Sequence, residues 1–173
     1  MIINKKVVMI IAPSDFRDEE LFEPKQILEQ EGVEVKIAST VMSNCIGMLG
    51  GSITPHMLIT DIKAEEFDAI IFVGGKGAIC YFYDSIAHKV VNDALKFNKL
   101  ICAICISPVI LANAGILGGK KATVWKTEGP KLLDKGAIYT ANRVEYDGKI
   151  ITADGPTSAT QFARSIIKGL KTE

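Results

Sequence analysis

Hydrophobic residues in this chain gather in short runs that alternate with amphipathic stretches. Four runs are continuous, apolar and partly β-branched, which is typical of strands buried on both faces of a sheet; they cover residues 6–12, 33–39, 68–73 and 99–104. Helical patterns follow three of these runs, at residues 18–31, 85–98 and 107–114, and a last helix is expected at about 158–171. This alternation predicts an α/β fold with a largely parallel, doubly wound sheet.

Two segments depart from the alternation. Between residues 40 and 64 the pattern breaks into glycine, serine and threonine, and "MLGGSITP" suggests a turn with a short extra strand. Residues 144–153, "VEYDGKIITA", predict a β-hairpin, because Asp147-Gly148 can supply the positive φ angles of a type I′ turn. No linker, repeat or low-complexity tract interrupts the chain, so we expect a single domain over residues 1–173.

Composition and charge narrow the classes of partner. The 173 residues include 20 lysines and arginines and 20 aspartates and glutamates, so the formal net charge is zero. The chain therefore shows no electrostatic footprint for nucleic acid or an anionic membrane, and we expect a small neutral partner. The first apolar run leads directly into a helix start and predicts a strand rather than a signal peptide, and no run reaches the ~18 residues of a membrane span. Four cysteines without a secretory signal favour free thiols in a cytoplasmic protein.

Ligands of such sheets bind outside the carboxyl ends of the strands. Four segments lie at these ends: "APSDFRDEE" after the first strand, "GGKGA" after the 68–73 strand, Cys105 after the 99–104 strand, and "ADGPTS" before the last helix. We expect them to converge on one pocket.

Cys105 stands between a predicted strand and a predicted helix, which is the order of a nucleophile elbow. Ala103 and Ser107 replace the glycines of the usual motif but are small enough for a tight turn, and Pro108 suits the first turn of a helix. A thiol at a helix N-terminus has a lowered pKa, so this position favours a reactive thiolate. The alternative is a buried structural cysteine.

Cys102 and Cys105 also spell C-x-x-C, which invites a redox or zinc interpretation. Cys102 falls inside the apolar strand, where extended geometry carries the two sulfur atoms too far apart for a disulfide. A second C-x-x-C or a histidine cluster is missing from the sequence, so we expect no metal. Cys102 is predicted to belong to the core.

The glycines of "VGGKGA" fit neither a dinucleotide-binding nor a phosphate-binding loop, so no cofactor is expected. Gly74 and Gly75 more plausibly allow a close approach of neighbouring backbone. The N–H group of Gly75 is a candidate oxyanion donor, together with the N–H of Ile106.

Glu20 is the acidic residue that the first helix is expected to turn inward. It precedes Ile27 and Leu28 by seven and eight residues, on the stripe that faces the sheet. A buried carboxyl keeps its proton and can donate a hydrogen bond to a nearby anion, so we pair Glu20 with Cys105. The neighbouring acidic residues are expected to be mostly solvated charges at a helix N-terminus; these are Asp18, Glu19 and Glu23.

Together, these motifs resemble the ThiJ/PfpI superfamily, which includes DJ-one and the intracellular PfpI proteases. The resemblance spans nearly the whole chain and rests on "EELFEP", with Glu20 four residues before Pro24, on "DAIIFVGGKGA", "LICAICISP" and "NRVEYDGKIITADGP", and on the final helix. It implies a flavodoxin-like α/β fold with helices on both faces, as in class I glutamine amidotransferases. It also implies a reactive cysteine at Cys105, a hydrogen-bonding glutamate at Glu20, and a homodimer or higher homo-oligomer.

The resemblance leaves three activities open. The first is cofactor-independent chemistry on small aldehydes or dicarbonyls, of the glyoxalase or deglycase kind, which we expect. The others are oxidation sensing through a Cys105 sulfinate and peptidase or amidase activity. The pocket is expected to include Gly74, Ser107, Trp125, Gly155 and Pro156 beside the catalytic pair.

The sequence departs from the family pattern in its histidines. PfpI-type proteases place a histidine directly after the nucleophile, where this chain has Ile106, and Trp125 stands where some DJ-one-like members have a histidine. His56 and His88 fall in no family motif. A histidine base for the thiol is therefore not evident, which weakens the peptidase hypothesis.

Overall fold

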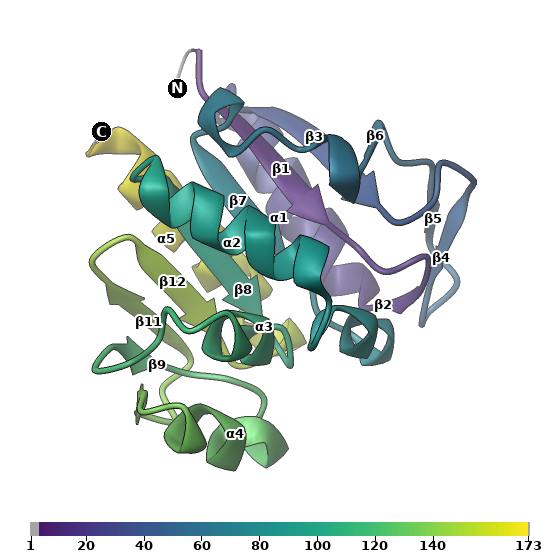
Figure 1. Ribbon diagram of the computed structural model, residues 1–173. Coiled ribbons are helices and arrows are strands. Elements are labelled where there is room, and N and C mark those ends of the chain that lie inside the picture. The colour runs from purple at the N-terminus through teal and green to yellow at the C-terminus, as the bar shows by residue number, and fades with distance from the viewer. Residues whose placement is uncertain (1–3, 173) are drawn as a thin grey trace.

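A computed structural model describes residues 4–172, so residues 1–3 and 173 of the expected domain lie outside it. Its main sheet has seven strands in the order β11-β12-β8-β7-β1-β3-β6 (Figure 1). The four predicted central strands are present, all parallel, as β1 (Lys6–Ile10), β3 (Glu34–Ser39), β7 (Ala69–Phe72) and β8 (Leu100–Ile104). The predicted α/β fold with a largely parallel sheet is thus confirmed.

Helices cover both faces of the sheet (Figure 1). One face carries α1 (Asp18–Gln30) and α5 (Ala159–Lys171), which pack on each other, and the other carries α2 (Ser85–Lys96) and α3 (Pro108–Asn113). Strand side chains alternate between the two layers, as a period of two requires: Val8 and Ile10 join the core under α2 and α3, whereas Val7 and Met9 join the core under α1 and α5. Cys102 lies fully buried in the second core, as predicted.

The glycine-rich segment contributes two strands to a small second sheet. This sheet consists of β2 (Ser14–Phe16), β4 (Cys45–Gly47) and β5 (Ser52–Ile53); the predicted turn lies between β4 and β5, and β5 is the short extra strand. Next along the chain, β6 (Met57–Leu58) pairs with the edge strand β3.

The predicted hairpin is present, but its predicted turn type is wrong. Strand β11 (Val144–Asp147) pairs antiparallel with β12 (Ile150–Ala153), and Asp147 lies opposite Ile150. The turn residues are therefore Gly148 and Lys149, of which only Gly148 has a positive φ, at 63°. A positive φ at the first turn residue alone is the pattern of type II′.

The chain between α3 and β11 contains short elements that carry little periodicity. They are β9 (Lys121–Ala122), α4 (Gly129–Asp134) and β10 (Ile138–Tyr139). Short 3₁₀ helices complete the described chain: η1 (Ile59–Asp61), η2 (Ala64–Glu66), η3 (Lys76–Tyr81), η4 (Lys126–Glu128) and η5 (Pro156–Ser158). Within residues 4–172, every helix is too short or too polar to span a bilayer.

Candidate active site

Cys105 forms the sharp turn between β8 and α3. Its φ of 64° lies in the left-handed region, which costs a residue with a side chain about 1–3 kcal/mol and persists only where neighbouring structure enforces it. Two main-chain hydrogen bonds do so here: the Cys105 N–H donates to Ala153 O at 2.9 Å, and Trp125 N–H donates to Cys105 O at 2.7 Å. The turn is therefore tied to β12 and to the segment after β9.

Cys105 is nearly buried, and only 9% of the residue is exposed. The main-chain N–H groups of Gly75 and Ile106 donate toward Sγ, and both lower the pKa of the thiol. These are the two amides that the sequence analysis named as oxyanion donors. They give the site two fixed donors for negative charge.

Glu20 lies beside Cys105, as the helical stripe predicted. Its side chain is fully buried, and among residues 4–172 no partner satisfies either carboxyl oxygen with normal hydrogen-bond geometry. The nearest polar groups are the Cys105 thiol and the Gly74 N–H, which are close enough to influence the pKa of the carboxyl. A carboxyl so placed is available to donate or accept a proton at the sulfur.

Gly74 lies between the side chains of Glu20 and Cys105, and it has no side chain that would keep them apart. A Cβ atom on Gly74 would lie 2.3 Å from Glu20 Oε2 and 2.4 Å from Cys105 Cβ. Both distances are far below van der Waals contact, so a glycine here is what allows Glu20 and Cys105 to approach each other. Gly75 has a separate reason to be glycine, because its φ is 98° and a Cβ would meet Arg17 N at 2.3 Å.

Burial raises the pKa of Glu20 from its ordinary value of 4.5 to about 8, which agrees with the expectation that this carboxyl is protonated. The pKa of Cys105 is also raised, first by burial and then by the negative charge of Glu20. The direction is opposite to the lowered pKa expected from the sequence. The N–H donors stabilise the thiolate, but the loss of water around the sulfur destabilises it by more.

The two groups must therefore be treated as one titrating pair. The repulsion from Glu20 acts on Cys105 only while Glu20 is ionised. When the pair has lost a single proton, two N–H groups, those of Gly75 and Ile106, stabilise a charge on the sulfur, whereas one, that of Gly74, stabilises a charge on the carboxyl group. This asymmetry favours the thiolate of Cys105 beside a protonated Glu20.

A cavity of about 230 Å³ opens in front of Cys105. All four predicted segments contribute to it, as expected at the carboxyl ends of parallel strands. Its lining residues are Arg17, Met48, Gly75, Lys76, Cys105, Ile106, Trp125 and Pro156.

Three of the expected pocket residues lie elsewhere. Ser107 is fully buried, and its hydroxyl donates to Val73 O at 2.8 Å, so it fixes the start of α3 behind the cysteine. Gly74 lies between Glu20 and Cys105 rather than on the cavity wall. Gly155 lines an adjoining cavity, whereas Trp125 and Pro156 lie where they were expected.

Asp18 is a structural residue that the sequence analysis missed by treating it as a solvated charge. It is 8% exposed, and its carboxylate accepts hydrogen bonds from Leu49 N at 2.8 Å and Gly51 N at 2.7 Å. These bonds fix the turn between β4 and β5 that carries Met48 to the cavity. The glycines of "GMLGG" were the available signal, because a Cβ on Gly51 would lie 2.4 Å from Asp18 Oδ1.

Arg17 and Lys76 were also missed, and they give the cavity a cationic edge. The Arg17 guanidinium donates to both carboxylate oxygens of Glu19, at 2.8 and 3.0 Å, which holds it at the start of α1. Neither residue stood out in the sequence, because isolated basic residues in loops are common on any surface.

The two histidines contact main-chain groups away from the cavity. His56 Nδ1 accepts a hydrogen bond from Ile37 N at 2.9 Å, and His88 Nε2 lies 2.9 Å from Phe82 O. Neither lines the cavity of Cys105. No group of three or more potential metal ligands occurs in the part of the chain that the structure describes.

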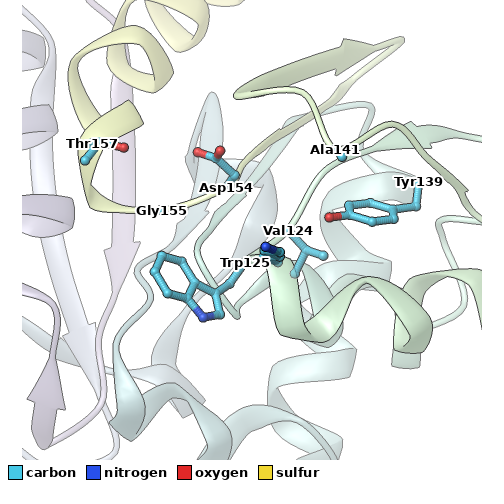
Figure 2. A pocket seen from close by; sticks show the side chains of 8 residues that line it. Val124, Trp125, Tyr139, Ala141, Asp154, Gly155 and Thr157 are labelled. Carbon is cyan, nitrogen blue, oxygen red and sulfur yellow. The ribbon is translucent and has the colours of Figure 1, made fainter.

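A larger cavity of about 610 Å³ shares Trp125 with the first, and Figure 2 shows the residues that line it. Trp125 lines both, and its ring packs on Gly155, where a Cβ atom would lie 2.9 Å from ring carbons. The remaining lining residues of the larger cavity are Val124, Lys126, Tyr139, Ala141, Asp154 and Thr157.

Comparisons with known proteins agree with this architecture. Residues 5–169 match the model of the DJ-1/PfpI family. The crystal structure of a ThiJ/PfpI domain protein from Brachyspira murdochii superposes with a TM-score of 0.95 at 32% identity, with 97% of each chain covered.

Curated relatives match over most of their length. An uncharacterized protein of Methanocaldococcus jannaschii is 44% identical over 171 residues, covering 97% of this chain and 83% of that protein. A deglycase of Pyrococcus horikoshii is 28% identical over 164 residues, covering 95% of this chain and 99% of the deglycase. A glutathione-independent glyoxalase of Caenorhabditis elegans is 27% identical over 171 residues, covering 99% of this chain and 91% of the glyoxalase.

Proposed function

The chain belongs to the DJ-1/PfpI family, and from this premise we propose that it converts small reactive dicarbonyl compounds, with Cys105 as the nucleophile and Glu20 as the proton carrier. The observation that carries the proposal is the fully buried Glu20 carboxyl beside a cysteine in a strained turn. The names of the relatives support the substrate class, since similar proteins include deglycases and a glutathione-independent glyoxalase.

The first step is addition of the thiolate to the aldehyde of a compound such as methylglyoxal. Sγ bonds to the aldehyde carbon, the π electrons of the carbonyl move to its oxygen, and that oxygen takes the proton of Glu20 to give a hemithioacetal. The N–H groups of Gly75 and Ile106 stabilise the oxygen while it is negative.

The second step isomerises the adduct. Glu20, now a carboxylate, removes the hydrogen of the former aldehyde carbon as a proton, and the electron pair forms an enediolate with the neighbouring carbonyl. Glu20 returns the proton to the neighbouring carbon, and the hydroxyl proton moves to the other oxygen, which leaves a thioester of lactate. Water then displaces Sγ. The sum is methylglyoxal plus water to lactate and a proton, with no external oxidant or reductant.

Lactate formation from methylglyoxal by the purified protein tests the proposal. We expect turnover that falls at least about a hundredfold in Cys105→Ala, because the covalent route is then closed. Cys80→Ala is the matched control, since Cys80 is exposed and does not line the Cys105 cavity. Failure of the wild-type protein to form lactate, or equal rates in Cys105→Ala, would contradict the assignment.

A second candidate, oxidation sensing, is favoured by the donors around the sulfur. Peroxide would oxidise the Cys105 thiolate to the sulfenate and a second equivalent would give the sulfinate, whose oxygens the Gly75 and Ile106 N–H groups and protonated Glu20 can bind. The lactate assay separates the two, because a sensor shows little turnover. Peptidase activity is the weaker alternative, since neither His56 nor His88 lines the cavity to protonate an amine leaving group.

A further inference from the structure

We propose that Arg17 and Lys76 make the cavity of Cys105 selective for dicarbonyl compounds that carry a carboxylate group. The dicarbonyl part of this substrate class rests on the proposed function, whereas the preference for an anion does not. The preference follows from the charges at the cavity and from the way in which the chain holds them.

The lining of this cavity carries positive charge. Apart from Cys105 itself, Arg17 and Lys76 are its only ionisable side chains, so within the described chain no carboxylate lines it. Glu20 lies behind Gly74 and, with a pKa raised by burial to about 8, keeps its proton at neutral pH. Because the formal net charge of the chain is zero, the excess of positive charge is local to this edge.

Arg17 offers a guanidinium that is fixed and only partly used. Its Nε and Nη2 atoms bind Glu19, which leaves Nη1 without a hydrogen-bond partner among residues 4–172. The pKa of Arg17 is raised, first by the hydrogen bonds to Glu19 and, among smaller causes, by the charge of Cys105. The guanidinium therefore lies within electrostatic reach of the sulfur atom.

Lys76 supplies a positive charge that the chain does not neutralise. It is exposed at the cavity and has no ion-pair partner in the part of the chain that the structure describes. Its main chain is held in place, because its N–H donates to Met48 Sδ at 3.5 Å and the next residue, Gly77, packs so closely on β2 that a Cβ atom would lie 1.9 Å from Ser14 O. The ammonium at the end of the side chain is thus free to meet a ligand.

A main-chain hydrogen bond ties the two cations to the same edge of the cavity. The N–H of Arg17 donates to Gly74 O at 2.9 Å, so the start of α1 is joined to the loop that carries Lys76. Glu19 offsets the charge of Arg17, which leaves one net positive charge. Guanidinium and ammonium groups form charge-assisted hydrogen bonds with carboxylates, and a single net charge matches a carboxylate rather than a phosphate dianion.

The space in front of Cys105 suits a short chain between the carbonyls and the carboxylate. About 230 Å³ is more than a three-carbon compound fills, and the side chains of Met48, Trp125 and Pro156 give apolar contacts for methylene groups. Carboxyethylglyoxal has this form, with two methylene groups between the ketone and the carboxylate. Its conversion follows the steps given for methylglyoxal: with water it yields an α-hydroxy dicarboxylate and a proton, as the aldehyde carbon is oxidised and the ketone carbon is reduced.

Alkylation of Cys105 by a matched pair of reagents tests the preference for an anion. Iodoacetate carries a carboxylate, and iodoacetamide has nearly the same shape without the charge. The measurement is the ratio of the two rates at Cys105, by peptide-level mass spectrometry, relative to the same ratio for the small neutral thiol N-acetylcysteine amide. We expect the ratio at Cys105 to be higher by at least about tenfold, because the charges meet in a partly desolvated cavity. A ratio equal to that of the free thiol, or below it, would overturn the proposal.

Two lysine variants identify the charge responsible. Lys76→Gln should abolish most of the preference, because it removes the net charge and leaves the main-chain contacts intact. Lys168→Gln removes the same charge from the last turn of α5, outside the lining of both cavities, and should not change the ratio. An unchanged ratio in Lys76→Gln, or an equal fall in Lys168→Gln, would contradict the assignment.

Turnover of two substituted glyoxals tests the substrate class. Carboxyethylglyoxal is compared with isopentylglyoxal, in which an isopropyl group replaces the carboxylate. We expect kcat/KM to be at least about tenfold higher for carboxyethylglyoxal. Equal values, or conversion of neither compound, would overturn the substrate class. The alkylation ratio requires no turnover, so a loss of anion preference and a failure of the lactate assay are separate results.

Discussion

At the scale of single residues, the site depends on how two acidic protons are distributed between Glu20 and Cys105. Burial penalises charge on either group, so both pKa values rise, and the first ionisation belongs to the pair. Two main-chain N–H groups face the sulfur. The account therefore places the charge on Cys105 and the remaining proton on Glu20.

Gly74→Ala tests whether the close approach of the pair matters. The new Cβ would meet Glu20 Oε2, Cys105 Cβ and the Ile104 carbonyl oxygen, the last at 2.6 Å, so the pair must move apart. We expect the free energy of unfolding to fall by about 1–3 kcal/mol and lactate formation to drop sharply. The readouts are urea unfolding and the lactate assay.

Gly118→Ala is the matched control for that change. Nothing lies within 4 Å of a Cβ at Gly118, and its φ is not in the left-handed region, so both stability and turnover should stay near wild type. If Gly74→Ala behaved like Gly118→Ala in both readouts, the spacing of Glu20 and Cys105 would not be set by Gly74.

At the scale of elements, the sequence predicted the strands and helices that are long enough to show a hydrophobic period. The strands β1, β3, β7 and β8 are uninterrupted apolar runs, and their ends differ from the prediction by at most two residues. The short elements α4 and β10 were not assigned, because a six-residue helix and a two-residue strand are too short to show a period. The hairpin turn differed because pairing of Asp147 with Ile150 moves the turn one residue along the chain.

The residues of the candidate site also fall into those that local patterns predict and those that depend on contacts between distant segments. Cys105 and Glu20 were predictable because a strand–helix junction and an inward helical stripe are local patterns. Asp18 and Met48 were not, since their contacts join α1 to the turn between β4 and β5, about thirty residues away in sequence. The raised pKa of Cys105 likewise depends on burial by several segments, which no local pattern reveals.

At the scale of the whole molecule, a buried Glu20 couples stability to pH. Its pKa is about 8 in the folded chain against an ordinary value of 4.5, so the folded state holds the proton more tightly. Its stabilising contribution is full below about pH 4.5 and is lost as pH rises through about 8.

The expected homodimer or higher homo-oligomer, and the single domain, stay predictions.

Glu20→Gln isolates this effect, because glutamine resembles the protonated carboxyl and cannot ionise. Urea unfolding should show equal stabilities near pH 4 and an advantage of the variant that grows by up to about 1.4 kcal/mol per pH unit toward pH 8. A difference between wild type and variant that is constant over this range would show that Glu20 does not titrate in the fold.

The central claim, that Cys105 is the reactive thiol of a coupled pair, is tested most directly by limited iodoacetamide labelling across pH 5 to 9, followed by peptide-level mass spectrometry. The account predicts that Cys105 labels ahead of Cys45, Cys80 and Cys102, because two main-chain N–H groups stabilise its thiolate, and that buried Cys102 is slowest. Cys80 is the internal reference, because it is exposed to the reagent, while partial loss of water around its thiol and the charge of Asp84 raise its pKa to about 11. Labelling of Cys105 no faster than Cys80 or Cys102 would contradict the account.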